Sequence, residues 1–90
     1  MEILDQLKFD EKGLITAGVQ DIDTNQILMV AYMNRDAVKK TIISNLACFW
    51  SRSRQEFWVK GQTSGHTQTV KSVSVDCDGD ALLVKVEQKG

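Results

Sequence analysis

The sequence predicts an α+β fold, mainly of antiparallel strands in a barrel-like arrangement with one central helix. Short alternating apolar runs recur along the chain, turn-forming residues separate them, and a single segment shows the period of an amphipathic helix. The 90 residues contain no proline, and their 6 glycines are scattered. Because no linker or repeat interrupts the pattern, we expect one domain over residues 1–90.

Two pairs of β-type runs are expected to form hairpins. Residues 14–22 and 26–33 are joined by Asp23-Thr24-Asn25, whose side chains can bond their own backbone in a tight turn. Residues 47–51 and 56–59 flank a polar stretch that predicts a second, exposed turn. Later runs over residues 72–75 and 82–87 indicate further strands, and we expect about seven strands in the whole chain.

A helix is expected over residues 35–45. Asn34 is a candidate N-cap, because its side chain can accept a hydrogen bond from the first free amides of the helix. Val38, Ile42 and Leu46 recur at intervals of four and would form one buried stripe.

Composition limits the classes of function. The formal net charge of −1 argues against a nucleic-acid binder, which needs a basic surface. No apolar run approaches the ~20 residues of a membrane helix, and the first residues do not resemble a signal peptide, so we expect a cytoplasmic protein without a membrane partner. A chain this short is marginally stable alone, which favours an oligomer.

The strongest local signal is Asp76-Cys77-Asp78-Gly79-Asp80. In an extended chain Asp76, Asp78 and Asp80 would share one face and Cys77 would point the other way. Carboxylates suit Mg²⁺ and a thiolate suits Zn²⁺, so the segment could address two metals. The alternative is an ordinary acidic turn between two strands, because Asp and Gly are common turn formers.

A second candidate site is basic. Arg52, Arg54 and Lys60 supply cationic donors, and the Ser64-Gly65 turn could direct backbone amides at an anion. These residues are therefore candidate phosphate ligands, against the alternative of a solvated hairpin tip.

The aromatic residues and the single histidine allow more than one interpretation. Trp50 and Trp58 could stack on a purine or belong to the core. His66 is a candidate acid or base, although an isolated histidine is more often a surface or packing residue. Cys48 lies in an apolar run and is most simply a small buried hydrophobe.

Taken together, these segments resemble phosphoribosyl-AMP cyclohydrolase, an enzyme family of histidine biosynthesis. The resemblance extends from about residue 14 to residue 90, and no single segment carries it. It rests on the order and spacing of four blocks: QILMVAYMN at residues 26–34, WSRSR at 50–54, WVKGQTSGH at 58–66 and DCDGD at 76–80.

The resemblance implies a hydrolase that opens the adenine ring of N1-(5-phosphoribosyl)-AMP at the N1–C6 bond. It implies a homodimer with shared sites, in which Asp76, Asp78 and Asp80 bind Mg²⁺ and Cys77 helps to bind Zn²⁺. Zinc would lower the pKa of a bound water, so that the resulting hydroxide could attack C6 of the adenine. The two phosphate groups of the substrate would give Arg52, Arg54, Lys60, Ser64 and Gly65 a role.

The resemblance also implies a tail after the last strand, with two further zinc cysteines and a histidine between them. The sequence ends at Gly90, before such a tail, and we expect that the tail exists beyond these residues. The alternative is a truncated, inactive form. A different class of function is a non-catalytic module that binds nucleotides or single-stranded nucleic acid through Trp50, Trp58 and the basic tip.

Overall fold

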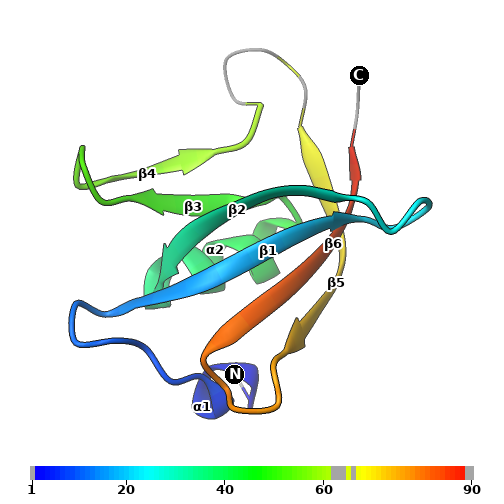
Figure 1. Cartoon of the computed structure of the whole chain (residues 1–90). Coiled ribbons are helices and arrows are strands. Elements are labelled where there is room, and N and C mark those ends of the chain that lie inside the picture. The colour runs from blue at the N-terminus through cyan, green and yellow to red at the C-terminus, as the bar shows by residue number, and fades with distance from the viewer. Residues whose placement is uncertain (1, 62–64, 66, 89–90) are drawn as a thin grey trace.

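The computed structural model describes residues 2–61, 65 and 67–88, and these residues form an α+β fold (Figure 1). A four-stranded sheet has the strand order β2-β1-β6-β5, and β3 and β4 form a separate two-stranded sheet. The elements are α1 (Glu2–Gln6), β1 (Leu14–Asp21), β2 (Ile27–Asn34), α2 (Arg35–Ser44), β3 (Cys48–Ser51), β4 (Glu56–Val59), β5 (Gln68–Val75) and β6 (Ala81–Gln88).

The predicted α+β class with one main helix is confirmed, but the barrel-like arrangement is wrong. Strand β6 lies between β1 and β5 and runs parallel to β1, so the sheet is mixed, with the other pairs antiparallel. Strands β2 and β5 remain its two edges among the described residues. Four strands are too few to close on themselves, since small barrels use about eight strands or a partly open five.

Both predicted hairpins are present. In the first, the Asp21 carboxylate accepts hydrogen bonds from the amides of Asp23 and Thr24 at 2.8 and 3.2 Å, and Asn25 takes a left-handed conformation with φ of 63°. In the second, β3 pairs with β4 from Cys48 opposite Val59 to Ser51 opposite Glu56. The expected turn residues therefore close the first hairpin, and the polar stretch closes the second.

Helix α2 begins where the sequence predicts. The Asn34 side chain accepts a hydrogen bond from the Ala37 amide at 2.8 Å, and the helix ends at Asn45 in a left-handed conformation. Val38 is buried as expected, whereas Ile42 is only partly buried and Leu46 lies beyond the helix. No described helix is long and apolar enough to span a bilayer.

The core lies between α2 and one face of the large sheet. On β1, Ile15, Ala17 and Val19 are buried while Thr16 is exposed, as expected for a strand with one covered face. Phe49 of β3 is fully buried, and the Thr41 hydroxyl of α2 bonds both the amide and the carbonyl of Cys48 at 3.1 Å. These contacts fix the β3–β4 hairpin against the helix and the sheet.

The short helix α1, which the sequence analysis missed, ends against the turn between β5 and β6 (Figure 1). The Lys8 amide donates to the Gly79 carbonyl at 2.7 Å. Gly79 has a φ of 76°, and a Cβ added there would lie 2.6 Å from the Gln6 carbonyl oxygen. The acidic turn is thus packed directly against the N-terminal segment, with no room for a side chain at position 79.

Replacement of Gly79 by alanine is expected to destabilise the fold more than the same change at Gly13. Both glycines have a φ near 77°, but a Cβ at Gly13 meets nothing within 4 Å. Gly13→Ala should therefore cost only the backbone strain, about 1–2 kcal/mol, and Gly79→Ala should add a backbone clash. Urea unfolding of the two variants makes the comparison, and equal losses would show that α1 does not pack on the turn.

Candidate active site

A cleft of about 790 Å³ lies between strand β2 and the β3–β4 hairpin. Its lining combines basic, aromatic and hydroxyl side chains, among them Lys12, Tyr32, Trp50, Ser51, Arg52 and Trp58. One side of the cleft is formed by the turn between β3 and β4. The opposite side includes residues of β2 on the face of the sheet that α2 does not cover. Such a mixture suits a ligand that carries both a flat ring and an anionic group.

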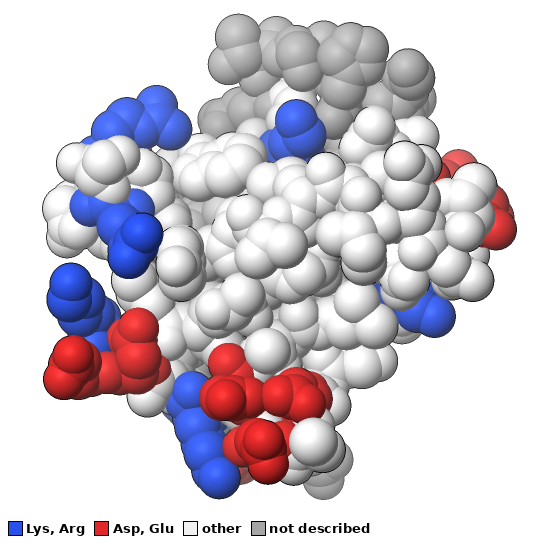
Figure 2. Space-filling view, in the orientation of Figure 1, with Lys and Arg blue, Asp and Glu red and all other residues white. Residues whose placement is uncertain are grey.

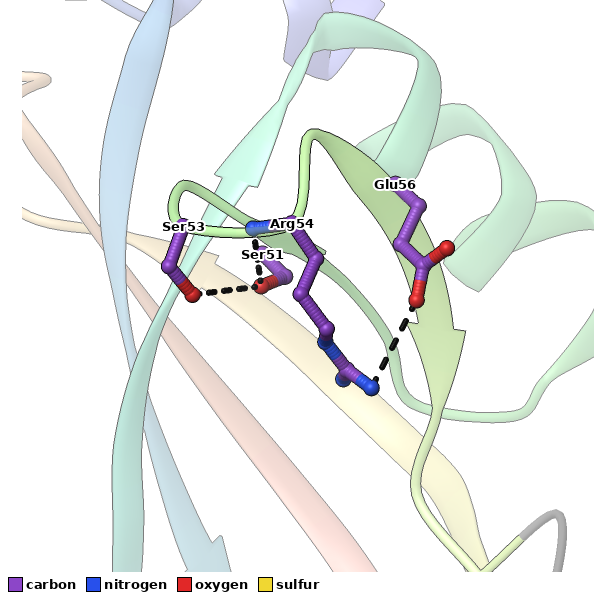
Figure 3. A network of polar contacts seen from close by, with 4 residues as sticks. All are labelled: Ser51, Ser53, Arg54 and Glu56. Atoms are coloured by element: carbon purple, nitrogen blue, oxygen red, sulfur yellow. Dashed lines mark hydrogen bonds and ion pairs between the residues drawn. The ribbon is translucent and has the colours of Figure 1, made fainter.

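The two arginines of the β3–β4 turn differ in their surroundings. Arg52 lines the cleft, and its Cζ lies 4.2 Å from the ring centroid of Tyr32. Arg54 instead forms an ion pair with Glu56, with 3.5 Å between Nη1 and Oε1 (Figure 3). Arg52 is therefore the better candidate to bind a ligand in the cleft.

Hydroxyl groups shape the same turn. The Ser51 hydroxyl accepts a hydrogen bond from the Arg54 amide at 3.3 Å and lies 3.4 Å from the Ser53 hydroxyl (Figure 3). The Gln55 side chain donates to the Arg52 carbonyl at 2.7 Å, and Gln55 itself has a φ of 53°. Side-chain bonds thus hold the backbone that carries Arg52.

The two tryptophans do not form a sandwich. Trp50 pairs with Phe57 across the hairpin, whereas Trp58 pairs with Phe49, so the two indoles lie on opposite faces of the ribbon. Trp58 packs on the buried Phe49 ring at a centroid distance of 4.8 Å, and Trp50 meets the Phe57 ring edge-on at 4.9 Å. Both line the cleft, but Trp58 is also part of the packing around the core.

The acidic segment is a turn between β5 and β6, so the prediction of an extended chain is wrong there. The turn closes through the Asp76 amide bonded to the Ala81 carbonyl and the Gly79 amide bonded to the Asp76 carbonyl. Ligand atoms of Asp76, Cys77 and Asp78 all lie within 4.8 Å of one another. The turn therefore brings the thiol to the same side as the carboxylates instead of separating them.

The carboxyl groups of this turn also influence one another. A hydrogen bond between the Asp80 and Asp76 side chains lowers the pKa of Asp76 and raises the pKa of Asp80. A hydrogen bond to the Asp76 carboxylate raises the pKa of the Cys77 thiol. Closely spaced, exposed oxygen donors of this kind fit a hard divalent cation, and the neighbouring thiol offers a softer ligand.

The turn and the cleft lie apart in a single chain. Carboxylates gather at the lower end of the molecule in Figure 2, where Figure 1 places the β5–β6 turn, and basic groups gather at the upper left, near the β3–β4 turn. A hollow of about 250 Å³ beside the acidic turn, lined by Gln6 and Lys8, shares no residue with the cleft. The two candidate sites are thus separate surfaces of one subunit.

The remaining predicted residues lie elsewhere or outside the described residues. Lys60 continues the hairpin through its amide, which donates to the Ala47 carbonyl at 3.0 Å, and it does not line the cleft. Gly65 has a φ of 82°, and its amide donates to the Gly61 carbonyl at 2.8 Å. Ser64 and His66 lie outside the described residues.

Two cleft residues were missed as candidates. Tyr32 belongs to one of the recognised sequence blocks, and its register opposite Thr16 places it on the face away from the helix. The signal available in the sequence was the alternation of the strand, which puts Tyr32 on the opposite face from Met33, and an aromatic residue on the uncovered face of a strand is a candidate ligand contact. Lys12 precedes β1 in a turn and gives no signal in the sequence alone.

Cys48 is buried as predicted, and its burial raises the pKa of its thiol.

Comparison with known proteins decides the family. The phosphoribosyl-AMP cyclohydrolase family model matches residues 29–90. The chain belongs to the phosphoribosyl-AMP cyclohydrolase family. The resemblance drawn from the four sequence blocks is therefore confirmed, and both the cleft and the acidic turn include residues of those blocks.

Curated family members match almost the whole chain. The phosphoribosyl-AMP cyclohydrolase of Bifidobacterium adolescentis is 56% identical over 88 residues, which cover 98% of this chain and 65% of that protein. The family members of Chlorobium chlorochromatii and Chloroherpeton thalassium are 53% and 51% identical, over 99% and 100% of this chain. The chain thus spans about 65% of the length of these relatives.

Proposed function

We propose that the protein hydrolyses the N1–C6 bond of the adenine ring in N1-(5-phosphoribosyl)-AMP, a step of histidine biosynthesis in the cytoplasm. The observation that carries the proposal is the pairing, in a member of this family, of an aromatic and basic cleft with a turn of clustered carboxylates and one thiol. The cleft supplies binding groups for a phosphorylated purine, and the turn supplies metal ligands. Residues 1–90 form the domain that presents both.

The cleft would bind the substrate. Arg52 would hold one phosphate, because a guanidinium can donate two parallel hydrogen bonds to phosphate oxygens. Lys12 and the Ser51 hydroxyl line the same cleft and add donors, and Trp50 offers a ring face for the purine. Arg54, Lys60, Ser64, Gly65 and Trp58 remain proposed contacts for the second phosphate and the ribose.

The acidic turn would hold the metals. Asp76, Asp78 and Asp80 are the proposed Mg²⁺ ligands, and Cys77 is the proposed ligand to Zn²⁺. When bound, zinc supplies the Lewis acidity that makes a water nucleophilic near neutral pH. A catalytic zinc usually takes three protein ligands, and Cys77 is the exposed thiol among the described residues, so further ligands must come from elsewhere. His66 is the proposed acid or base.

A homodimer would unite the two surfaces. The acidic turn and the basic cleft lie apart in one subunit, and their charges are opposite (Figure 2). A two-fold axis repeats both surfaces, so the turn of one subunit can face the cleft of the other. A chain of this size also gains stability from burying surface against a partner.

Arginine variants test the substrate half of the proposal. Arg52→Ala should lower kcat/KM for N1-(5-phosphoribosyl)-AMP by roughly 10- to 150-fold, the value of a lost charge-assisted contact. Arg54→Ala is the matched control from the same turn, and it should lose less because Glu56 already pairs with Arg54. Steady-state kinetics of both variants measure these losses. An unchanged kcat/KM in Arg52→Ala would show that the β3–β4 turn aids solubility and does not bind the substrate.

The alternative class is a module that binds nucleotides or single-stranded nucleic acid without catalysis. It would use the same cleft, but its binding would be indifferent to divalent metals and would fall steeply with salt. Ring opening that a chelator abolishes and added metal restores would exclude this alternative. The formal net charge of −1 already argues against a nucleic-acid partner.

A further inference from the structure

We propose that Tyr32 is a positioning residue for Arg52, whose guanidinium it holds over the cleft for a substrate phosphate. This inference rests on the proposed function, because it assigns Tyr32 a part in the same binding site. The observation behind it is the position of the Arg52 Cζ, 4.2 Å from the centroid of the Tyr32 ring, with both residues lining the cleft. A guanidinium this close to an aromatic face is attracted by the ring quadrupole.

Tyr32 lies in a strand of the large sheet, whereas the arginine that it contacts lies in a turn. Tyr32 is paired with Thr16 in the β1–β2 ladder and is next to the fully buried Met33 in the chain. Arg52 lies in an exposed turn, where a long side chain has many rotamers available. The sheet therefore provides the rigid partner, and the ring restricts the mobile one.

The contact orients Arg52 without neutralising it. In the same turn Arg54 is paired with the Glu56 carboxylate, whereas no ion pair joins Arg52 to a carboxylate of the described residues. An aromatic ring carries no charge, and contact with it leaves most of the N–H donors of a guanidinium available to an anion. Arg52 thus keeps both its charge and its donors for a phosphate, and its place in the cleft comes from Tyr32.

The test uses Tyr32→Leu, Tyr32→Phe, Arg52→Ala and the Tyr32→Leu/Arg52→Ala double variant. Calorimetry measures the affinity of each for adenosine 5′-monophosphate. Tyr32→Leu should weaken binding by about 2- to 30-fold, the range of a cation–π contact from exposed to desolvated. Tyr32→Phe keeps the ring and should bind as the parent does. In the Arg52→Ala background Tyr32→Leu should have no further effect, because Tyr32 acts through Arg52.

A second measurement reads the contact itself. The ring current of Tyr32 should shift the Arg52 side-chain proton resonances upfield in the parent and in Tyr32→Phe, and the shift should vanish in Tyr32→Leu. This readout decides the matter if Arg52→Ala leaves binding too weak to measure. Thermal melting of each variant shows that the fold is retained.

Three results would overturn the inference. Parent-like affinity in Tyr32→Leu would show that the ring does not contribute, and an equal loss in the Arg52→Ala background would show that the ring contacts the nucleotide directly. Either result leaves the proposed function intact if Arg52→Ala itself weakens binding. A parent protein that binds no adenosine 5′-monophosphate would overturn the inference and the proposed substrate site together.

Discussion

Replacement of Cys77 by serine is expected to abolish ring opening in the whole protein, together with stoichiometric zinc. The thiolate is a soft ligand suited to zinc, and a serine hydroxyl of similar size remains protonated near neutral pH and binds zinc poorly. Cys77 is exposed in the turn that also carries the carboxylates, so its replacement should not disturb packing. Metal analysis and the turnover of N1-(5-phosphoribosyl)-AMP measure the two losses.

Cys48 provides the matched control for this thiol. It is buried in β3, away from the acidic turn, and Cys48→Ala removes its sulfur while keeping a small apolar side chain. This variant should retain zinc and kcat, with at most a lower melting temperature. Full activity in Cys77→Ser, or loss of zinc in Cys48→Ala, would contradict the assignment of Cys77.

Asp78→Asn is expected to weaken Mg²⁺ binding by at least about 10- to 100-fold, because even residues behind the ligands of a metal affect affinity by that much. An amide has almost the shape of the carboxylate but lacks its charge, and Asp78 is exposed, so the fold should survive. Calorimetry with Mg²⁺ measures the effect, and circular dichroism checks the fold.

Asp23→Asn removes an exposed carboxylate from the β1–β2 turn and is the control for charge alone. It should leave Mg²⁺ affinity unchanged. If Asp78→Asn and the parent bind Mg²⁺ with equal affinity, the acidic segment is only a solvated turn and not a metal site. Equal losses in both variants would point to a general electrostatic effect instead of a site.

Local chemistry made the hairpins and the main helix predictable. Asn34 can cap a helix through one short-range hydrogen bond, and that bond is present. The acidic and amide residues of the first turn likewise act within a few positions of one another. Features that depend on neighbours in the chain can be read from the sequence, because few arrangements compete with them.

The strand order was not predictable in the same way. The parallel pairing of β1 with β6 joins residues about 65 positions apart, for example Thr16 with Ala81, and alternation does not specify which strands become neighbours. Strand β5 also begins at Gln68, before the alternation of Ser72 to Val75 starts. A register irregularity between Val70 and Ser72 accounts for the broken pattern at its start.

The candidate site shows the same division. The types of residue at the site were predictable, but the directions of their side chains were not, because the basic and the acidic cluster both lie in turns. Spacing alone would put Arg52 and Arg54 on one face, yet one lines the cleft and the other pairs with Glu56. Spacing would likewise separate Cys77 from Asp76, whereas the turn at Gly79 brings them together.

Co-expression of two inactive subunits tests the central claim, that the cleft and the acidic turn of different subunits form one site. Arg52→Ala disables the cleft and Cys77→Ser disables the turn. A random mixture should recover roughly a quarter of the parent kcat/KM, because half of the dimers are mixed and each of these holds one intact site. Activity no higher than that of the separate variants would contradict the claim and place the whole site within one subunit.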